Sequence, residues 1–530
     1  MQLLEVAVTS RAVAATAGRS AKVVLLAHCL GLAAADPSPA TVPAVVAYLS
    51  GELPQRRTGL GLAAMRGTPA PAGAATLTVA EVDHAFTRAE AMMGAGSTAA
   101  RRGLLHDLLA RAVADEQRLL VGLVTGELRQ GAAQALVLDA VAVAVGLPVG
   151  AVRRAMTLSG SAASVAVSAL AEGADGLAAF GLQVGRPLSP MLAQSAPGLV
   201  EALERTGPAA VEAKLDGIRV QVHRADDAVT GFTRSLDEVT DRLPEVVEAV
   251  RALPARSLVL DGEVLALAGD DRPRPFQVTA ARTARRSDPA ADRLRTPLTL
   301  FAFDLLHVDG TDLLDHPVAD RRRALARLLD VDVPGLVLTP SVEVSDPGDT
   351  AQVAAAAAFV TATLSRGHEG VVVKALDAPY AMGRRGAGWV KVKPVHTLDL
   401  VVLAAEWGHG RRTGRLSNLH LGARDPDGRF GSAGGFVMLG KTFKGLTDAM
   451  LAWQTEHLQQ LAVAPSGAER GWVVRVRPEL VVEIALDGVQ TSPRYPAAVA
   501  LRFARVLRHR PDRLAADADT VDAVLALGAT

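Results

Sequence analysis

The sequence predicts a multidomain α+β protein in which a helical part, a mixed part and a β-rich part follow one another. In the first part, Ala, Leu and Val recur at helical spacing and the pattern breaks at Gly and Pro. From about residue 209 short alternating strands are interleaved with helices, and from about residue 397 strands follow without long helices between them. We therefore expect an all-α domain over 1–180, a connector over 181–208, an α+β domain over 209–396, and a small β-barrel with a helical tail over 397–530.

Length and composition indicate ordinary globular domains. The chain has 530 residues, 49% of them hydrophobic, and no apolar run reaches the roughly 18 residues of a membrane helix. The first residues lack the basic segment of a secretory signal, so we expect a soluble cytoplasmic protein without membrane contact. The single cysteine, Cys29, excludes an intramolecular disulfide and a zinc site with two or more cysteines, and we expect it to be buried.

The all-α part and the connector are distinguished by their Gly and Pro content. The connector has three prolines and three glycines within 181–198 and no clear period, and the stretch 67–76 predicts a loop. Helices are expected near 9–34, 40–50, 81–93, 99–123, 131–146, 148–158 and 162–171.

Lysine is rare in this chain. Of 56 Lys and Arg residues, seven are lysines, at positions 22, 214, 374, 391, 393, 441 and 444. Because Arg can replace Lys on a solvated surface at little cost, the remaining lysines should be enriched where the two are not interchangeable. Six of the seven lie between residues 214 and 444, so we expect the chemistry in that region.

The segment 212–224, EAKLDGIRVQVHR, predicts a β-hairpin with Asp216 and Gly217 in a two-residue turn. In that register Lys214 stands opposite Arg219, on the face that also carries Glu212. Two like charges opposite each other are destabilising, so this face is either a plain solvated surface or a site for an anion.

Further along, polar residues interrupt apolar strands. Trp389, Lys391 and Lys393 alternate and share one face, where two lysines repel unless an anion lies between them. Glu263 follows a Gly inside an alternating strand and Glu369 opens an apolar one. Taken alone, Glu263 is also compatible with an ion pair at a buried sheet edge, which is the less favoured alternative.

These segments together resemble the sequence motifs of the covalent nucleotidyltransferases. The hairpin matches KxDG followed by Arg, and five more motifs follow in the family order over about 180 residues: GFTRS at 231–235, DGEVLAL at 261–267, LFAFDLLHVDG at 300–310, EGVVVK at 369–374 and GRRGAGWVKVKP at 383–394. Beyond them, the segment 501–513 is similar to motif VI of the ATP-dependent DNA ligases. Upstream, 119–132 and 186–193 resemble the helical domain and connector of those ligases, most nearly the actinobacterial type called ligase B.

The resemblance implies an all-α DNA-binding domain, an α+β adenylation domain and a C-terminal OB-fold, with ATP and Mg²⁺ or Mn²⁺ as cofactors. It makes Lys214 the nucleophile that takes AMP from ATP. A lysine amine can lose its proton when cationic neighbours or burial favour the neutral form, whereas Arg stays protonated. The other implied nucleotide contacts are Glu212 (adenine), Phe303 (stacking on adenine, with Phe301 as packing), Arg219 and Arg234 (ribose and phosphate), Glu263 (ribose or metal), Glu369 (metal), and Arg385, Lys391 and Lys393 (phosphate).

In motif VI the family usually has Asp-Lys, and this chain has Asp512 followed by Arg513. Arg keeps the positive charge that would orient the leaving pyrophosphate, so we expect adenylation to be retained, with Arg510 as a further member of the motif.

DNA binding must come from local patches, because the formal net charge is zero. The candidates are Arg101, Arg102, Arg118 and Arg129 in the first part and Arg411, Arg412, Arg415, Lys441 and Lys444 in the barrel. Such contacts would bind the backbone rather than read bases. The expected partner is nicked duplex DNA, bound by a monomer; replication or repair proteins could act in trans.

Two alternatives to a DNA ligase remain open on these residues. An RNA ligase or capping-type nucleotidyltransferase would share the central motifs, although the helical first part argues against it. A non-catalytic protein that binds nicks would be expected to have lost one of the motif residues, and all are present. NAD⁺ as donor is disfavoured because those ligases carry a four-cysteine zinc module.

Overall fold

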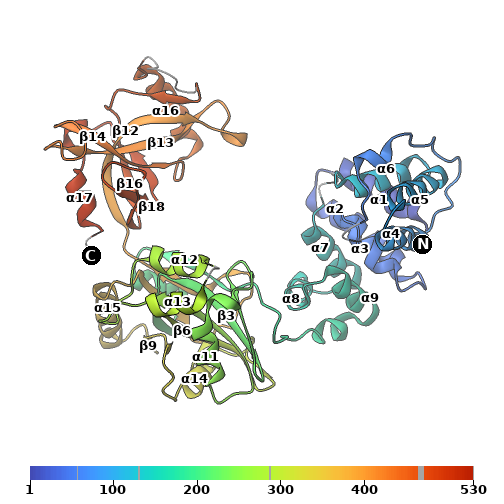
Figure 1. Ribbon diagram of the computed structural model, residues 1–530, viewed down its shortest axis with the longest axis horizontal. Helices are drawn as coiled ribbons and strands as arrows, with labels where there is room; N and C mark the ends of the chain where they lie inside the picture. The colour runs from blue at the N-terminus through green and yellow to red at the C-terminus, as the bar shows by residue number, and fades with distance from the viewer. Residues whose placement is uncertain (56–57, 129, 131, 286–287, 464–470, 529–530) are drawn as a thin grey trace.

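The chain forms three bodies along its length, shown in Figure 1. The computed structural model describes residues 1–528 apart from 56–57, 129, 131, 286–287 and 464–470. In the view of Figure 1 the β-rich body lies above the central two-sheet body and the helical body lies to its right, with open space between the two. Among the described residues, no helix combines the length and apolarity needed to cross a bilayer.

The first body is all-α, with one continuous apolar core. Its helices are α1 (Leu3–Ala15), α2 (Arg19–Ala34), α3 (Thr41–Ser50), α4 (Val79–Ala91), α5 (Ser97–Arg111), α6 (Ala114–Thr125), α7 (Gln134–Val145), α8 (Val149–Ser159) and α9 (Ala162–Ala178). The expected helix 9–34 is wrong as one element, because Thr16 and Gly18 adopt extended backbone between α1 and α2. The expected helix 99–123 is likewise two helices, since Ala112 and Val113 are extended.

Cys29 lies on α2 with none of its side chain exposed. Burial raises the pKa of its thiol to about 11, against a hydrogen bond with Thr9 that lowers it. This cysteine is therefore a small apolar core residue.

The central body contains two β-sheets. The first has the strand order β1-β11-β10-β2-β9, and the second has the order β4-β3-β5-β6-β7 with β8 beside β6. The first consists of β1 (Leu192–Ala196), β2 (Ala209–Lys214), β9 (Ser341–Val344), β10 (Gly370–Ala375) and β11 (Arg385–Val392); the second of β3 (Ile218–Ala225), β4 (Ala228–Thr233), β5 (Ser257–Ala266), β6 (Leu298–Val308), β7 (Thr311–Asp312) and β8 (Leu336–Leu338).

Six α-helices of the described residues accompany these sheets. α10 (Leu199–Thr206) and α15 (Thr350–Ser365) contact the first sheet, and α11 (Pro244–Arg251), α12 (Phe276–Ala284) and α14 (Val318–Leu328) contact the second, with α13 (Pro289–Arg295) against α11. Separate apolar clusters under each sheet hold the helices in place.

The predicted hairpin at Asp216 and Gly217 is wrong, because β2 and β3 belong to different sheets. β2 pairs with β9 and β10, so Lys214 stands beside Gly370, while Arg219 of β3 stands beside Glu263. The two residues carry the chain from one sheet to the other at a close crossing: a Cβ on Gly217 would lie 2.3 Å from the carbonyl oxygen of Val264. Lys214 therefore ends its strand at the junction of the two sheets.

Part of the predicted connector belongs to the central body. β1 and α10 fall within 181–208, and β1 pairs in parallel with β11. The earlier residues lie against the second sheet through backbone N–H donors: Leu182 to Asp312 Oδ2 at 3.1 Å, Gly185 to His223 Nδ1 at 3.0 Å and Leu188 to Gln221 Oε1 at 2.7 Å. The segment lacks a sequence period because side chains of the second sheet, and not its own regular structure, hold its backbone in place.

The connector contact predicts an acid-sensitive stability. Burial, together with nearby His307, lowers the pKa of His223 to about 4, and its Nδ1 must stay unprotonated to accept from Gly185. Since an unfolded His titrates near 6.5, stability should be lost as the pH falls from about 6.5 to about 4, by up to about 3 kcal/mol. Urea unfolding at pH 7 and pH 5 should show a smaller difference for His223→Gln than for the unmodified protein; equal differences would contradict this role.

The third body is β-rich, as expected for the OB-fold region. Its main sheet has the order β14-β13-β12-β16-β19, with β15 also on β12 and a separate ribbon of β17 and β18. The strands are β12 (His396–Trp407), β13 (Leu416–Asp425), β14 (Gly435–Thr442), β15 (Val473–Arg475), β16 (Val481–Leu486), β17 (Gly488–Thr491), β18 (Val499–Arg502) and β19 (Arg505–His509). The expectation of strands without a long helix between them is wrong at one place, since α16 (Asp448–Gln460) separates β14 from β15; α17 (Val521–Ala526) follows as the short tail.

Candidate active site

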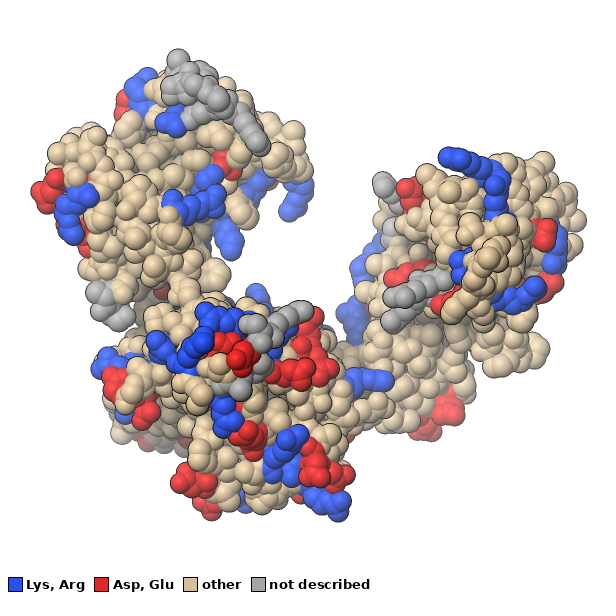
Figure 2. Space-filling view, in the orientation of Figure 1, with Lys and Arg blue, Asp and Glu red and all other residues tan. Residues whose placement is uncertain are grey.

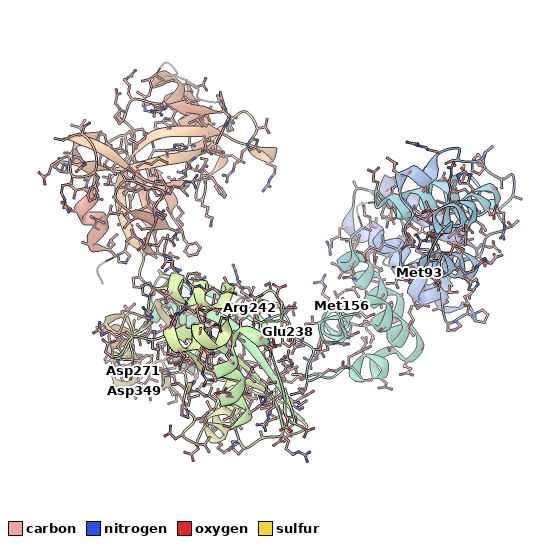
Figure 3. All side chains as sticks on the ribbon, viewed as in Figure 1. Met93, Met156, Glu238, Arg242, Asp271 and Asp349 are labelled. Carbon is pink, nitrogen blue, oxygen red and sulfur yellow. The ribbon has the colours of Figure 1, made fainter. Side chains whose placement is uncertain are left out.

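A cavity of about 1350 Å³ lies between the two sheets of the central body. Residues of β2, β3, β5, β6, β10 and β11 line it, together with the segment 233–243 and α12. Of the residues predicted for the nucleotide, those in the lining are Glu212, Lys214, Arg219, Arg234, Glu263, Phe303, Arg385 and Lys391. Glu238 and Arg242, labelled in Figure 3 near the edge that faces the helical body, line its outer part.

Lys214 and Glu369 meet at the edge of the cavity. The Lys214 ammonium forms an ion pair and hydrogen bond with the Glu369 carboxylate, which also accepts from Lys393 Nζ at 3.0 Å. Burial acts to raise the pKa of Glu369, but the two lysines outweigh it and hold that pKa below its usual value. Glu369 is therefore a carboxylate held between two ammonium groups, although it does not line the cavity itself.

Glu263 has the opposite electrostatic behaviour. Burial raises the pKa of its carboxyl group to about 7, although Lys214, Arg219 and a hydrogen bond from Gly217 act to lower it. That hydrogen bond joins Gly217 N to Glu263 Oε1 over 3.1 Å. The crossing between the sheets thus orients this side chain in the cavity.

Aromatic rings form one end of the cavity. Phe303 and Trp389 meet edge to face with their centroids 6.1 Å apart, and Tyr380 packs on Trp389 in the same way at 5.8 Å. Strict alternation would place Phe301 on the same face as Phe303, but the pairing of β5 with β6 shifts register between Ala302 and Asp304. Phe301 consequently packs in an apolar cluster with Leu215 while Phe303 lines the cavity.

Glu212 lies at the aromatic end with only 2% of its residue surface exposed. Its Oε1 accepts from Arg322 Nη1 at 2.6 Å and its Oε2 pairs with Lys374 Nζ at 2.5 Å. The sequence interpretation gave no role to Arg322 or Lys374. The scarcity of lysine was a signal for Lys374, whereas Arg322 is the middle of three consecutive arginines and had none.

Arg219 is anchored away from Lys214. Its Nε and Nη2 donate to Asp261 at 2.9 and 2.6 Å, and its Nη1 donates to the Met191 carbonyl at 2.7 Å. Tyr380 also donates to Asp261, at 2.6 Å. This buried network fixes both the arginine and the start of β1 in position.

Lys391 and Lys393 differ in their surroundings. Burial and the charges of Lys393, Lys214 and Arg385 lower the pKa of Lys391, and no carboxylate among the described residues forms an ion pair with it. Lys393 is paired with Glu369 and with Asp487 of the β-rich body, which raise its pKa against the effect of burial. Among the described residues, Lys391 is thus a cation that lines the cavity without a paired carboxylate.

The structure does not bring the predicted motif VI residues to this cavity. Arg510 and Arg513 both pair with Asp399 of β12, at 3.1 and 3.3 Å, and Asp512 pairs with Arg510. The β-rich body instead reaches the cavity edge through Asp487 and through Arg502, which donates to Asp216 at 2.8 and 3.2 Å.

Several predicted DNA contacts already have protein partners. Lys441 pairs with Glu406, Arg118 with Asp115, Arg412 donates to the Phe443 carbonyl, and Arg101 and Arg102 donate to backbone carbonyls. Arg129 lies outside the described residues. Figure 2 shows Lys and Arg side chains of the β-rich body projecting toward the open space between the three bodies.

The site is a cavity between two sheets, with an aromatic end, a cationic end and a lysine at its edge. Together with the OB-fold region that follows the central body, this site defines a nucleotidyltransferase-type enzyme. The comparisons with known proteins are specific. The ATP dependent DNA ligase domain matches residues 190–393, the ATP dependent DNA ligase C terminal region matches 412–513, and the DNA ligase N terminus matches 60–142.

Full-length relatives agree with these domain matches. The chain is 56% identical over 525 residues to the probable DNA ligase of Streptomyces griseus, covering 99% of each protein. It is 54% identical over 528 residues to DNA ligase B of Mycobacterium tuberculosis, covering 99% of this chain and 100% of that one. A solved chain titled "Pmar-Lig_Pre." shares the fold, with a TM-score of 0.53 and 17% identity over 96% of this chain and 99% of its own. The chain belongs to the ATP-dependent DNA ligase family and is a DNA ligase.

Proposed function

We propose that Lys214 is the nucleophile of this ligase and forms a lysyl-AMP intermediate. The observation that carries the proposal is the position of its amine, which ends β2 at the cavity edge beside Glu369. After the ammonium loses a proton, Nζ bonds to the α-phosphorus of ATP and the bond from that phosphorus to the bridging oxygen breaks, releasing pyrophosphate.

Two further displacements would complete sealing. The 5′-phosphate at a nick attacks the same phosphorus and releases Lys214, giving a DNA-adenylate. The 3′-hydroxyl then attacks the 5′-phosphate, forming the phosphodiester and releasing AMP. Both displacements occur at phosphorus and develop negative charge, which cations placed in advance stabilise.

The cavity supports a division of labour among its residues. We assign the base to the aromatic end, with Phe303 stacking on it and Glu212 at its edge. Arg219, Arg234 and Glu263 are assigned to the ribose and the nearby phosphate. Lys391, Arg385 and Lys393 are assigned to the phosphates, and Lys391 has the surroundings best suited to that role.

A divalent cation fits the carboxylates present. Among the described residues no group of three or more His, Cys, Asp or Glu side chains could hold a metal ion, but Mg²⁺ commonly binds through one or two carboxylates together with substrate phosphates and water. Glu263 and Glu369 supply hard oxygen atoms of that kind. The ion, when bound, would neutralise charge on the phosphates.

Chelation is therefore expected to stop adenylation. Treating the protein with EDTA should reduce transfer of label from α-³²P-ATP to the protein at least about 100-fold, because the part of the phosphate charge that the ion neutralises would be uncompensated. Adding Mg²⁺ or Mn²⁺ in excess should restore it. Labelling that persists in EDTA would remove Glu263 and Glu369 from a metal role.

For DNA, we propose that the helical body, residues 1–180, and the β-rich body close around a nicked duplex while the central body acts on the nick. The cations facing the open space in Figure 2 support this assignment. We further propose that the enzyme is a monomer and works in the cytoplasm, where its DNA substrate is found.

Nick sealing on a labelled duplex tests the function. ATP should support sealing and NAD⁺ should not, and the protein should acquire acid-stable label from α-³²P-ATP. The preformed adenylate, offered nicked DNA, nicked RNA and 5′-diphosphate RNA in competition, should react with nicked DNA. Preference for either RNA would favour an RNA ligase or a capping enzyme instead, and absence of any label would favour a protein that only binds nicks.

A further inference from the structure

Resting on the proposed function, we propose that Arg322 is a positioning residue for base selection: it fixes Glu212 so that Glu212 and Lys374 present an acceptor and a donor to the Watson–Crick edge of adenine.

The Glu212 carboxylate is immobilised from two sides. Arg322 Nη1 holds Oε1 at 2.6 Å, and Lys374 Nζ holds Oε2 at 2.5 Å. Arg322 reaches this position from α14 and is itself fixed by a hydrogen bond from Nη2 to the Thr339 carbonyl at 2.9 Å. Because Arg322 does not line the cavity while Glu212 does, the arginine acts on a ligand through the glutamate.

Glu212 and Lys374 both have hydrogen-bonding capacity left for a ligand. A carboxylate has about four acceptor sites, so Glu212 can accept further hydrogen bonds beyond those to Arg322 and Lys374. An ammonium group has three donors, and Lys374 uses two, on Glu212 and on the Phe303 carbonyl at 3.0 Å. The Glu212 carboxylate can therefore still accept, and the Lys374 ammonium group can still donate, at neighbouring positions at the aromatic end of the cavity.

This pair matches adenine and opposes guanine. The Watson–Crick edge of adenine carries the 6-amino donor beside the N1 acceptor, whereas that of guanine carries the O6 acceptor beside the N1–H donor. With guanine in the same place, O6 would meet the carboxylate and N1–H would meet the ammonium group. Buried groups left without partners in this way are costly.

The surrounding rings indicate that the base lies here. Lys374 Nζ is 4.7 Å from the Phe303 ring centroid and 4.4 Å from that of Trp389, and both rings line the cavity. Lys374 also stands directly across from Trp389 in the pairing of β10 with β11. The donor and acceptor are thus part of the same wall as the flat aromatic surfaces that suit a purine.

A ligand-and-variant cycle tests the proposal. Dissociation constants for ATP and for purine riboside 5′-triphosphate, which lacks the 6-amino group, are measured by equilibrium dialysis in a Lys214→Ala background that cannot form the adenylate. With Arg322 intact, loss of the amino group should weaken binding about 10- to 100-fold, as for a hydrogen bond to a buried charge. With Arg322→Met the same loss should change affinity by less than about threefold.

The neighbouring arginine gives a matched control. Arg323 points to solvent, with 70% of its side chain exposed, and pairs with Asp320. Arg323→Met should keep the full penalty for losing the amino group. If losing the amino group costs Arg322→Met as much affinity as it costs the Lys214→Ala protein with Arg322 intact, the proposal is overturned. A purely structural role of Arg322 would lower the affinities for ATP and for purine riboside 5′-triphosphate together.

If Arg322→Met does not fold, the unmodified enzyme still tests the acceptor and the donor that Glu212 and Lys374 are proposed to present to the base. Adenylate formation with GTP, with 1-deaza-ATP, which lacks the N1 acceptor, and with purine riboside 5′-triphosphate should each be at least about 10-fold slower than with ATP. Equal rates would overturn the proposal. Failure of the proposed function looks different, since ATP itself would then leave no label on the unmodified enzyme.

Discussion

Lys214→Arg is expected to abolish self-adenylation, lowering the rate of label transfer from α-³²P-ATP by at least about 10⁴-fold. The substitution keeps a positive charge beside Glu369, so the ion pair at the cavity edge can persist. It removes the nucleophilic amine, because a guanidinium group does not lose its proton at neutral pH and cannot attack phosphorus. The measurement is acid-stable label on the protein after gel electrophoresis.

The same exchange at another lysine is the control. Lys22 on α2 donates to the Gln130 carbonyl at 3.2 Å, within the helical body, and Lys22→Arg should be labelled like the unmodified protein. Sealing of a nick whose 5′-phosphate already carries AMP should survive partly in Lys214→Arg, since that step does not use the amine. Label retained by Lys214→Arg would exclude Lys214 as the nucleophile.

The second large effect is on stability. Arg321 has none of its surface exposed, and its Nε and Nη2 donate to the two oxygens of Asp304 at 2.7 and 3.0 Å. Arg321→Met is expected to destabilise the central body by about 3–5 kcal/mol, because the Asp304 charge would remain buried without an opposite charge and with only the Leu305 N–H donating to it. The free energy of unfolding in urea at pH 7 measures it.

Two comparisons separate the buried charge from the loss of packing. Arg321→Met combined with Asp304→Leu should recover part of the loss, since replacing a buried ion pair by apolar groups is often close to neutral. Arg323→Ala, on the exposed side of the same helix, should change stability by less than about 0.5 kcal/mol. A change below about 1 kcal/mol for Arg321→Met would show that Asp304 finds another partner.

The sequence was sufficient to predict a helical, a mixed and a β-rich part, because periodicity is a local property. Its most visible turn signal, Asp216 followed by Gly217, predicted the wrong pairing. The turn preference acts over a few residues, whereas β2 is bound on both edges by strands that come more than 120 residues later in the chain. Long-range sheet pairing therefore overruled the local preference for a hairpin.

For the site, eight of the residues predicted for the nucleotide line the cavity, but the motifs missed the residues that support them. Arg322 and Tyr380 come from outside the motif residues, and only the folded chain places them against Glu212 and Asp261. For motif VI the opposite holds. Its residues are recognisable in the sequence, but in the structure Arg510 pairs with Asp399 in the β-rich body and does not reach the cavity. The position of one body relative to another is not encoded in the spacing of a motif.

The buried thiol of Cys29 makes the chain suited to site-directed labelling. Thiol reagents react with the thiolate, and a group with a pKa of about 11 that has no exposed surface offers almost none at neutral pH. Toward a nitroxide or maleimide dye the chain therefore behaves as if it had no cysteine. Cysteines introduced at the exposed positions Ala110 of α5 and Ala449 of α16 would carry the only labels, so the distance between the two probes could be followed as nicked DNA is added.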